Sequence, residues 1–345
     1  MKPHPKPNIN FLPNWKKSSH GTFPIVVVNG LWSSGKSLLI PVLNSFKFLQ
    51  SVQYDYHVEY YTILRAFNSL DDKSFRTMIN LHLDETYYSN EIGRKLNFRW
   101  KDDSSVQKTG RLLQSLKSLK SPEGDNRFLE AQAAGRALFM MTHNLFGIRD
   151  NLATALENRL KFIEIIDDPW TLLPKWCSYL ERFDGVREAT LSFELEKYKV
   201  PWFAWDFKNS YKHLSIPDKA ACSILQLLPP IMDFLESKDF RNESCLVVFT
   251  DSLRYSPHQE IEKISNFFGD YPDKSLGRVF KRLDLPRKKL KETDFKISRG
   301  GQLRSANSSH AMNQLSPKIK DAFYALAERF QNNWDKSSGK TLFKM

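Results

Sequence analysis

Short apolar runs alternate along this chain with longer stretches in which apolar residues recur at helical spacing. The apolar runs lie at 25–28, 137–141, 162–166 and 245–249, and they predict buried strands. Segment 51–61 alternates aromatic, apolar and polar residues and is a further candidate strand. Helical spacing occurs at 38–48, 62–95, 151–160, 170–183, 217–238, 257–268 and 317–334. Alternating strands and helices predict an α/β fold with three layers, αβα, around a mostly parallel central sheet.

The length of 345 residues suits one large α/β domain or two small ones. We expect residues 1–22 to form an irregular N-terminal arm and residues 23–345 to form a single domain. An insertion is expected around 90–130, where the stretch 102–127 is rich in Lys, Ser and Gln. The chain contains no internal repeat.

The best-defined motif lies directly after the first predicted strand. Residues Gly30 to Ser37 match the pattern G-x-x-x-x-G-K-[ST], and a predicted helix follows, which is typical of a P-loop-like nucleotide-binding fold. The glycines permit backbone paths that a Cβ would block, while the loop amides and the helix N-terminus point at a bound anion. Lys36 adds a positive charge for phosphate or sulfate oxygens. The residues predicted to hold the anion are Gly30, Ser33, Ser34, Gly35, Lys36 and Ser37.

The charge balance also points to an anionic ligand. Lys and Arg number 51 and Asp and Glu number 39, so the net charge is +12. This excess favours a nucleotide, an acidic glycan, a nucleic acid or a membrane surface as partner. No basic motif interleaved with aromatic residues stands out, so we do not expect nucleic acid. No apolar run approaches the length of a transmembrane segment.

The three cysteines, Cys177, Cys222 and Cys245, are far apart and odd in number. They form neither a disulfide framework nor a metal knuckle, which favours a reduced compartment and predicts a cytoplasmic protein. The N-terminal stretch lacks the apolar segment of a signal peptide. His and Cys residues never cluster at ligand spacing, so we expect no metal site.

One hypothesis for the function is a kinase or NTPase that uses ATP or GTP with Mg²⁺. It rests on the loop motif and on two predicted strands that end in an acid, Asp167 and Asp251. Either carboxylate would bind Mg²⁺ together with the Ser37 hydroxyl. Apolar strands that end in an acid are common in α/β proteins, so the signal beyond the loop is weak.

A second hypothesis comes from motifs spread over most of residues 24–334. They lie, in chain order, at 25–39, 141–143, 161–175, 249–269 and 299–317. Together they resemble the sulfotransferase superfamily, whose P-loop-like fold binds 3′-phosphoadenosine 5′-phosphosulfate (PAPS). The match of 249–269 to the family pattern Y-E-D-L…P…I…F-L-G is the most specific. The resemblance implies that 25–39 holds the 5′-phosphosulfate and that the stretch beginning Arg299-Gly300-Gly301 holds the 3′-phosphate and the ring.

The chain departs from the family where the 3′-phosphate is expected to bind. Asp167 occupies the position of a family arginine, Lys175 that of a family serine, and Met141 that of a family lysine. A carboxylate beside a phosphate costs about 4 kcal/mol for two charges ~4 Å apart at an effective dielectric of about 20. Either Lys175, Arg299 and Arg304 take over the missing role, or the nucleotide is not standard PAPS.

The resemblance implies in-line transfer of a sulfuryl group to an acceptor hydroxyl, with no metal required. Lys36 would neutralise charge on the leaving phosphate. His143 is the first candidate for the base because imidazole titrates near neutrality, with Glu59 second and His57 third. The acceptor is expected to be a glycan or a small molecule; for an anionic glycan, Arg94 is one candidate contact. A third hypothesis is a degenerate member that binds a nucleotide or a partner without chemistry.

Overall fold

The computed structural model describes residues 20–100, 105–107, 112–120, 123–186, 188–237, 244–287 and 306–337. Its centre is a sheet of five strands, each parallel to its neighbours, in the order β2-β3-β1-β4-β7. These strands are β1 (Ile25–Asn29), β2 (Gln53–Tyr54), β3 (Leu138–Met141), β4 (Leu160–Ile166) and β7 (Cys245–Phe249). Strands β2 and β3 lie on one side of β1, and the later strands β4 and β7 lie on its other side. The order of the strands therefore reverses at β1, and sheets of this kind bind ligands at such a topological switch point.

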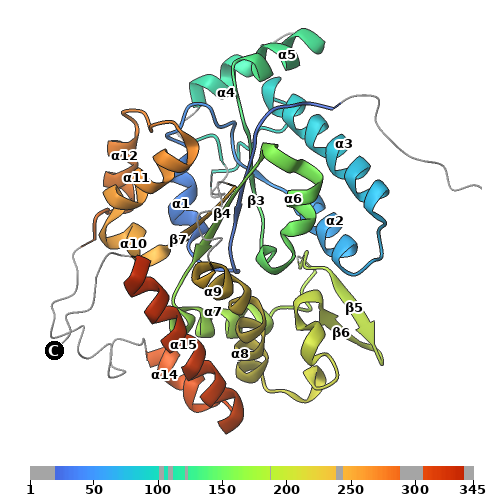
Figure 1. The fold of residues 1–345 in the computed structure, drawn as a ribbon, viewed down its shortest axis with the longest axis vertical. Helices are drawn as coiled ribbons and strands as arrows, with labels where there is room; N and C mark the ends of the chain where they lie inside the picture. The colour runs from blue at the N-terminus through green and yellow to red at the C-terminus, as the bar shows by residue number, and fades with distance from the viewer. Residues whose placement is uncertain are drawn as a thin grey trace, which may run out of the picture.

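The register of the sheet brings the ends of several strands to one edge. Val28 near the end of β1 pairs with Met141, the last residue of β3, and with Ile163 of β4. The loop after β1 and the polar residues after β3 and β4 therefore share the carboxyl edge of the sheet. In Figure 1 helices cover both faces of this sheet.

Helices α1 (Lys36–Leu43), α11 (Pro257–Phe268) and α12 (Leu276–Leu283) cover one face. Val26 and Val28 of β1 point to this side, as do Ile163 and Ile165 of β4, and they form one buried cluster with Leu39 of α1. Alternate residues of a strand face opposite sides of a sheet, so the neighbouring strand residues must pack elsewhere.

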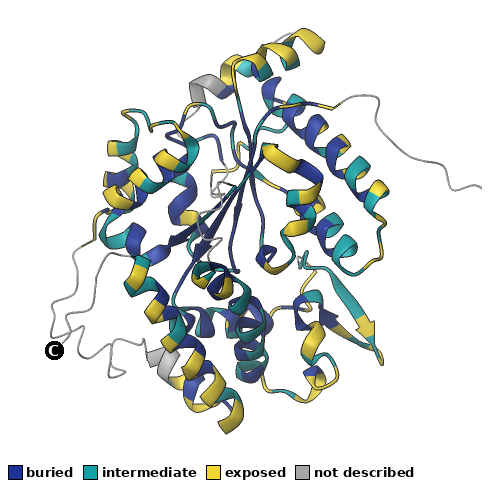
Figure 2. Cartoon of the chain, viewed as in Figure 1, coloured by how far each residue is buried: buried dark blue, intermediate teal, exposed yellow. Residues whose placement is uncertain are grey.

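Those neighbours form a second buried cluster on the opposite face. Ile25 and Val27 of β1 and Phe162 of β4 pack there with Trp176 and other helix residues. The helices on this side are α2 (Tyr56–Ala66), α3 (Asp72–Glu91), α6 (Asp150–Leu156), α7 (Pro169–Leu180), α8 (Ile216–Leu227) and α9 (Pro229–Glu236). Because both faces are covered, β1 and β4 are buried almost throughout, as Figure 2 shows by the dark strands.

The remaining elements are peripheral to the sheet. They are α4 (Leu112–Ser118), α5 (Asp125–Ala133), α10 (Thr250–Tyr255), α14 (Ala306–Asn313) and α15 (Pro317–Ser337), with the 3₁₀ turns η1 (Phe146–Ile148), η2 (Glu157–Arg159), η3 (Trp202–Phe207) and η4 (Tyr211–His213). An antiparallel hairpin joins β5 (Ser192–Leu195) to β6 (Tyr198–Pro201). Within the described ranges, no helix combines the length and apolarity needed to cross a membrane.

The predicted fold class is confirmed, and the four apolar runs are strands of the parallel sheet. The helix predicted at 257–268 has these bounds, with a proline in its first turn and Gly269 at φ 71° after its last. Of the strand predicted at 51–61, only Gln53–Tyr54 is a strand, and the rest of the prediction is wrong. The Asp55 carboxylate accepts hydrogen bonds from the amides of His57 and Val58, and this cap starts α2. The N-terminal arm, the single domain and the insertion stay predictions.

The fold predicts unequal effects for two glycine substitutions. Gly35 has φ 102°, and an added Cβ would lie 2.8 Å from the Thr250 side chain. Gly35→Ala should therefore lower the free energy of unfolding by about 2–3 kcal/mol, measured by urea denaturation.

Gly277→Ala is the matched control. Gly277 lies in α12 with nothing within 4 Å of its added Cβ, so alanine should raise the stability there by about 0.5–1 kcal/mol. Equal stabilities for the two variants would contradict the assignment of strain to Gly35.

Candidate functional site

The loop between β1 and α1 is shaped by close contacts at its two glycines. At Gly30 an added Cβ would lie 2.5 Å from the Ile165 carbonyl oxygen of β4. Ser33 and Gly35 both have positive φ, at 65° and 102°. The hydroxyl of Thr250, which directly follows β7, donates a hydrogen bond of 2.6 Å to the Ser34 carbonyl. Contacts with β4 and with the residue after β7 therefore hold the loop in this conformation.

Lys36 turns into this loop rather than out to solvent. It is only 6% exposed, and its Nζ donates hydrogen bonds to the carbonyls of Gly30 at 2.7 Å and Leu31 at 2.9 Å. Burial lowers the pKa of the Lys36 ammonium to about 8, although Glu164 and Glu59 counteract the shift. The ammonium thus lies inside the predicted anion cradle, while Ser37 beside it is exposed.

The first and second candidate bases form one hydrogen-bonded pair. His143 follows β3, Glu59 lies in the first turn of α2, and Nδ1 of the imidazole lies 2.9 Å from Oε1 of the carboxylate. Burial lowers the pKa of His143, the Lys36 charge lowers it further, and Glu59 opposes both effects. His143 is therefore disposed to be neutral and able to accept a proton. His57, the third candidate, is 63% exposed at its side chain and lies beside Asp55 instead.

A polar link that the sequence did not reveal lies behind the loop. Asn29 ends β1, and its Nδ2 donates a 2.6 Å hydrogen bond to Oε2 of Glu164 on β4. Its Oδ1 accepts from the hydroxyl of Thr142 at 2.9 Å. Burial raises the pKa of Glu164 to about 8, against the hydrogen bond from Asn29 and the charge of Lys36. The only sequence signal was the isolated carboxylate within the apolar run 162–166.

Two of the three residues that depart from the family pattern, Asp167 and Lys175, face each other. Asp167 is 1% exposed, and its carboxylate lies 3.4 Å from Lys175 Nζ. Arg254 of α10, which sequence analysis missed, lies 3.3 Å from the same carboxylate and 2.8 Å from Asp251. Burial raises the pKa of Asp167, although the two cations counteract this.

Lys175 reaches the loop as well, since its Nζ donates to the Ser33 carbonyl at 3.3 Å. Lys175 therefore lies next to the predicted cradle, and together with Arg254 it compensates the buried carboxylate. The other predicted 3′-phosphate contacts, Arg299, Gly300, Gly301 and Arg304, lie outside the described residues. Their role stays a prediction.

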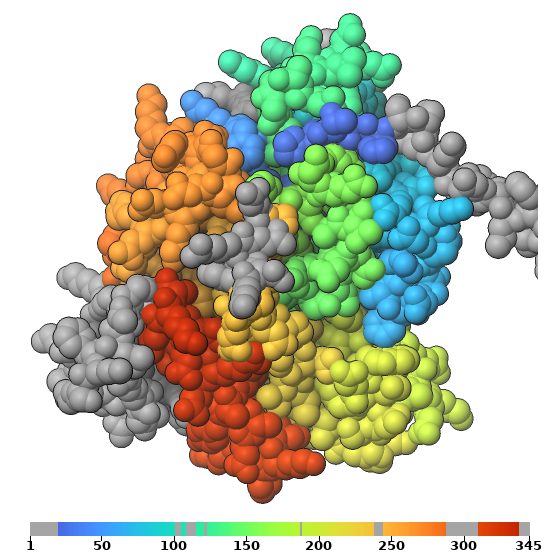
Figure 3. Space-filling view, in the orientation of Figure 1, coloured from blue at the N-terminus to red at the C-terminus, as the bar shows by residue number. Residues whose placement is uncertain are grey.

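A second carboxylate approaches the base from the segment before the hairpin. Glu188 counteracts the lowered pKa of His143 and accepts a hydrogen bond from the Tyr179 hydroxyl at 3.2 Å. The Tyr60 hydroxyl of α2 donates to the Ala189 carbonyl at 2.7 Å and joins this segment to α2. In Figure 3 the yellow-green hairpin region lies directly below the blue α2–α3 region.

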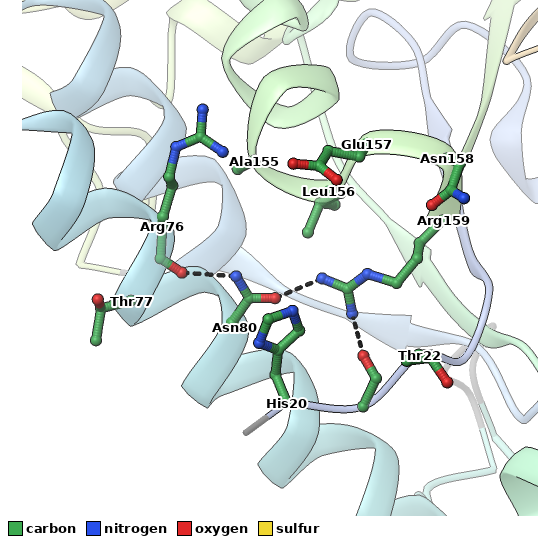
Figure 4. A pocket seen from close by; sticks show the side chains of 11 residues that line it. His20, Thr22, Arg76, Thr77, Asn80, Ala155, Leu156, Glu157, Asn158 and Arg159 are labelled. Atoms are coloured by element: carbon green, nitrogen blue, oxygen red, sulfur yellow. Dashed lines mark hydrogen bonds between the residues drawn. The ribbon is translucent and has the colours of Figure 1, made fainter. Parts of the chain in front are cut away.

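A cavity of about 490 Å³ lies at the opposite edge of the sheet (Figure 4). Its walls include Thr22 before β1 and η2 before β4. Arg159 in this wall donates to the Gly21 carbonyl at 2.7 Å and to Asn80, while Arg76 donates to Asp72 at 2.8 Å. Both guanidinium groups are thus engaged within the protein, and none of the predicted site residues lines this cavity.

The fold and the site define a parallel α/β protein whose strand–loop–helix at Gly30–Ser37 opens beside a His–Glu pair. No protein-family model matches the chain, and no curated protein matches it. The sulfotransferase domain of the Synechococcus PCC 7002 olefin synthase aligns at 16% identity with a TM-score of 0.45, over 93% of this chain and 98% of that one.

The sulfotransferase domain from the curacin biosynthetic pathway aligns at 13% identity and a TM-score of 0.42, over 90% of this chain and 98% of that one. A sulfotransferase from Mycobacterium avium aligns at 9% and 0.38, over 77% and 69%. The structural neighbours thus carry the name of the family that the motifs resemble.

The site predicts opposite shifts of the His143 pKa in two variants. Glu59→Gln removes the charge that favours the imidazolium, so the pKa should fall further below its usual value. Lys36→Met removes a repelling charge, so the pKa should rise. An NMR titration of the His143 ring protons measures the His143 pKa in both variants. His213→Ala, a substitution at an exposed position, is the control and should leave the His143 pKa unchanged. A shift of the same sign in both variants would contradict the coupling.

Proposed function

We propose that this chain is a sulfotransferase-like enzyme that transfers a sulfuryl group from PAPS to an acceptor hydroxyl. The observation that supports it most is the joint position of an anion-binding type of loop and a His–Glu pair at one sheet edge. The loop follows β1, and His143 follows β3, which pairs with β1. A donor anion in the loop and an acceptor hydroxyl at the imidazole would then lie on neighbouring strands.

In the proposed reaction the acceptor oxygen forms a bond to sulfur while the bond from sulfur to the phosphate oxygen breaks. Nδ1–H of His143 donates a hydrogen bond to Glu59 and keeps its proton. Nε2 is then the nitrogen that takes the hydroxyl proton. Glu59 fixes the ring and stabilises the imidazolium that forms. Lys36 exchanges the carbonyls of Gly30 and Leu31 for the ligand's oxygens and compensates the charge left on the phosphate.

The ion pairs at the ends of β4 and β7 favour this proposal over a Mg²⁺-dependent kinase. Asp167 is buried between Lys175 and Arg254, and Asp251 is bound to Arg254 as well. A Mg²⁺ ion at Asp167 would have to displace one cation and stand beside another, and a Mg²⁺ ion at Asp251 would have to displace Arg254. The proposed sulfuryl transfer needs no metal, and these cations are suited to a second anionic group of the nucleotide.

The charges near the base favour an acceptor without negative charge. Glu59 and Glu188 both raise the pKa of His143, so an acidic glycan would meet two carboxylates there. Arg94, a candidate contact for such a glycan, pairs with Glu123 at 2.6 Å. Arg94 follows the end of α3, where Glu91 accepts a hydrogen bond from Gln50, a residue ahead of β2. Arg94 therefore lies toward the amino edge of the sheet, away from the base. We therefore propose a neutral alcohol, sugar or phenol as acceptor.

A thermal-shift panel tests the ligand class. 3′-Phosphoadenosine 5′-phosphate and PAPS should raise the melting temperature without metal, since a ligand at a hundredfold excess over Kd stabilises by about 2.7 kcal/mol. ATP and GTP, each with Mg²⁺, are the comparison. If only the Mg²⁺ nucleotides stabilise the chain, it is not a sulfotransferase; if PAPS binds but is never turned over with any acceptor, the non-catalytic hypothesis holds.

The Asp167 cluster predicts opposite effects of two substitutions on nucleotide affinity. Asp167→Asn keeps the shape of the side chain and removes the charge that competes with a phosphate for Lys175 and Arg254. 3′-Phosphoadenosine 5′-phosphate should therefore bind about tenfold more tightly, or about 1.4 kcal/mol. Lys175→Met should weaken it by a similar factor. Calorimetric titration measures both.

Adenosine 5′-phosphosulfate, which lacks the 3′-phosphate, is the control ligand for these variants, and its affinity should change little. Lys161→Met is the control variant, because Lys161 is on β4 near the amino edge of the sheet and lies over the Phe267 ring. Equal changes for both nucleotides would show that the cluster does not meet the 3′-phosphate.

A further inference from the structure

Three side chains with metal-binding atoms meet at the start of α2. Asp55, His57 and His82 each offer one ligand atom, and these atoms all lie within 4.8 Å of one another. Asp55 and His57 flank the first residue of α2, and His82 is on α3, 27 residues from Asp55. This separation explains why the spacing of His and Cys residues in the sequence gave no sign of a metal site.

The ligand atoms of the three side chains already lie close together. His82 Nε2 lies 2.6 Å from Asp55 Oδ2, and His57 Nδ1 lies 3.7 Å from Asp55 Oδ1. The two imidazole rings have their centroids 5.0 Å apart. Asp55 and His82 are largely shielded from solvent, while His57 is exposed. A small ion would therefore be held from the protein side and stay open to water or a further ligand on the other.

The chemistry of the set matches a divalent transition metal. Two neutral imidazoles and a carboxylate are a common donor set for Zn²⁺, with bonds of about 2.0–2.2 Å. Donors that share such an ion lie about 3–3.5 Å apart, so small rotations of the two rings complete the geometry.

We propose that Asp55, His57 and His82 form a binding site for one Zn²⁺ or a similar divalent transition metal ion. The ion would tie the first turn of α2 to α3. Glu59 lies in that same first turn and holds His143, so the metal would stabilise the position of the pair without touching it. This proposal does not depend on the reaction assigned to the chain.

Titration of the full chain with Zn²⁺, after removal of metals by chelation, tests the site. Calorimetry with ZnCl₂ should give one equivalent bound with a Kd at or below the micromolar range. Co²⁺ in place of Zn²⁺ should give the visible absorption of a four- or five-coordinate ion with nitrogen ligands. His57→Ala is the first variant because His57 is exposed and its loss should not disturb folding. It should weaken Zn²⁺ binding by about 10–100-fold.

His82→Gln and Asp55→Asn should weaken binding in the same way, and urea denaturation would show whether they remain folded. His213→Ala and His143→Gln are controls that should leave the affinity unchanged, since neither residue belongs to the set. The proposal is overturned if the wild-type chain binds no Zn²⁺, or if His57→Ala binds it as tightly as the wild type does. In either case Asp55 only caps α2, and its contact with His82 is a hydrogen bond between two side chains.

Discussion

The carboxyl edge of the sheet depends on one buried ammonium group, that of Lys36. It satisfies two carbonyls of its own loop and lies near two carboxylates, Glu164 and Glu59. Burial alone favours the neutral amine, so those oxygens are what keeps a charge in this position. An anion entering the loop would be a further oxygen partner for the same group. The Lys36 ammonium thus preorganises the loop, and a bound anion would replace the carbonyls of Gly30 and Leu31 as its partners.

Short side chains on the strands keep this arrangement in place. Asn29 at the end of β1 binds Thr142 after β3 and Glu164 on β4, and Thr250 after β7 binds the Ser34 carbonyl. Four of the five parallel strands are therefore joined to the loop or to one another by buried polar groups. Sites built on strands keep their geometry more closely than sites on loops alone. The same rigidity carries over to His143, which directly follows Thr142.

Local sequence patterns were sufficient for four strands of the parallel sheet, for the loop after β1 and for the position of His143, but not for β2 or for the β5–β6 hairpin. Each depends on a short run of residues, and the local pattern agrees with the fold around it. Relations between distant residues were not predictable in this way. His143 and Glu59 were alternatives in the sequence because 84 residues separate them, yet they form one pair. Arg254 was missed because nothing around it in the sequence points to Asp167, 87 residues earlier.

Asp167 and Lys175 stand where the family pattern has an arginine and a serine. This difference changes how a phosphate would be bound here, but cations that can bind it are still present. A free carboxylate in this position would repel a phosphate, but this one is buried and shared by two cations. Asp167 binds both Arg254 and Lys175, which also reaches the Ser33 carbonyl, and it limits the freedom of both long side chains. A phosphate would gain two cations that are already ordered, and it would have to compete with the carboxylate that orders them. Since Arg254 keeps Asp251 as a second partner, Lys175 is the cation more easily released to a ligand.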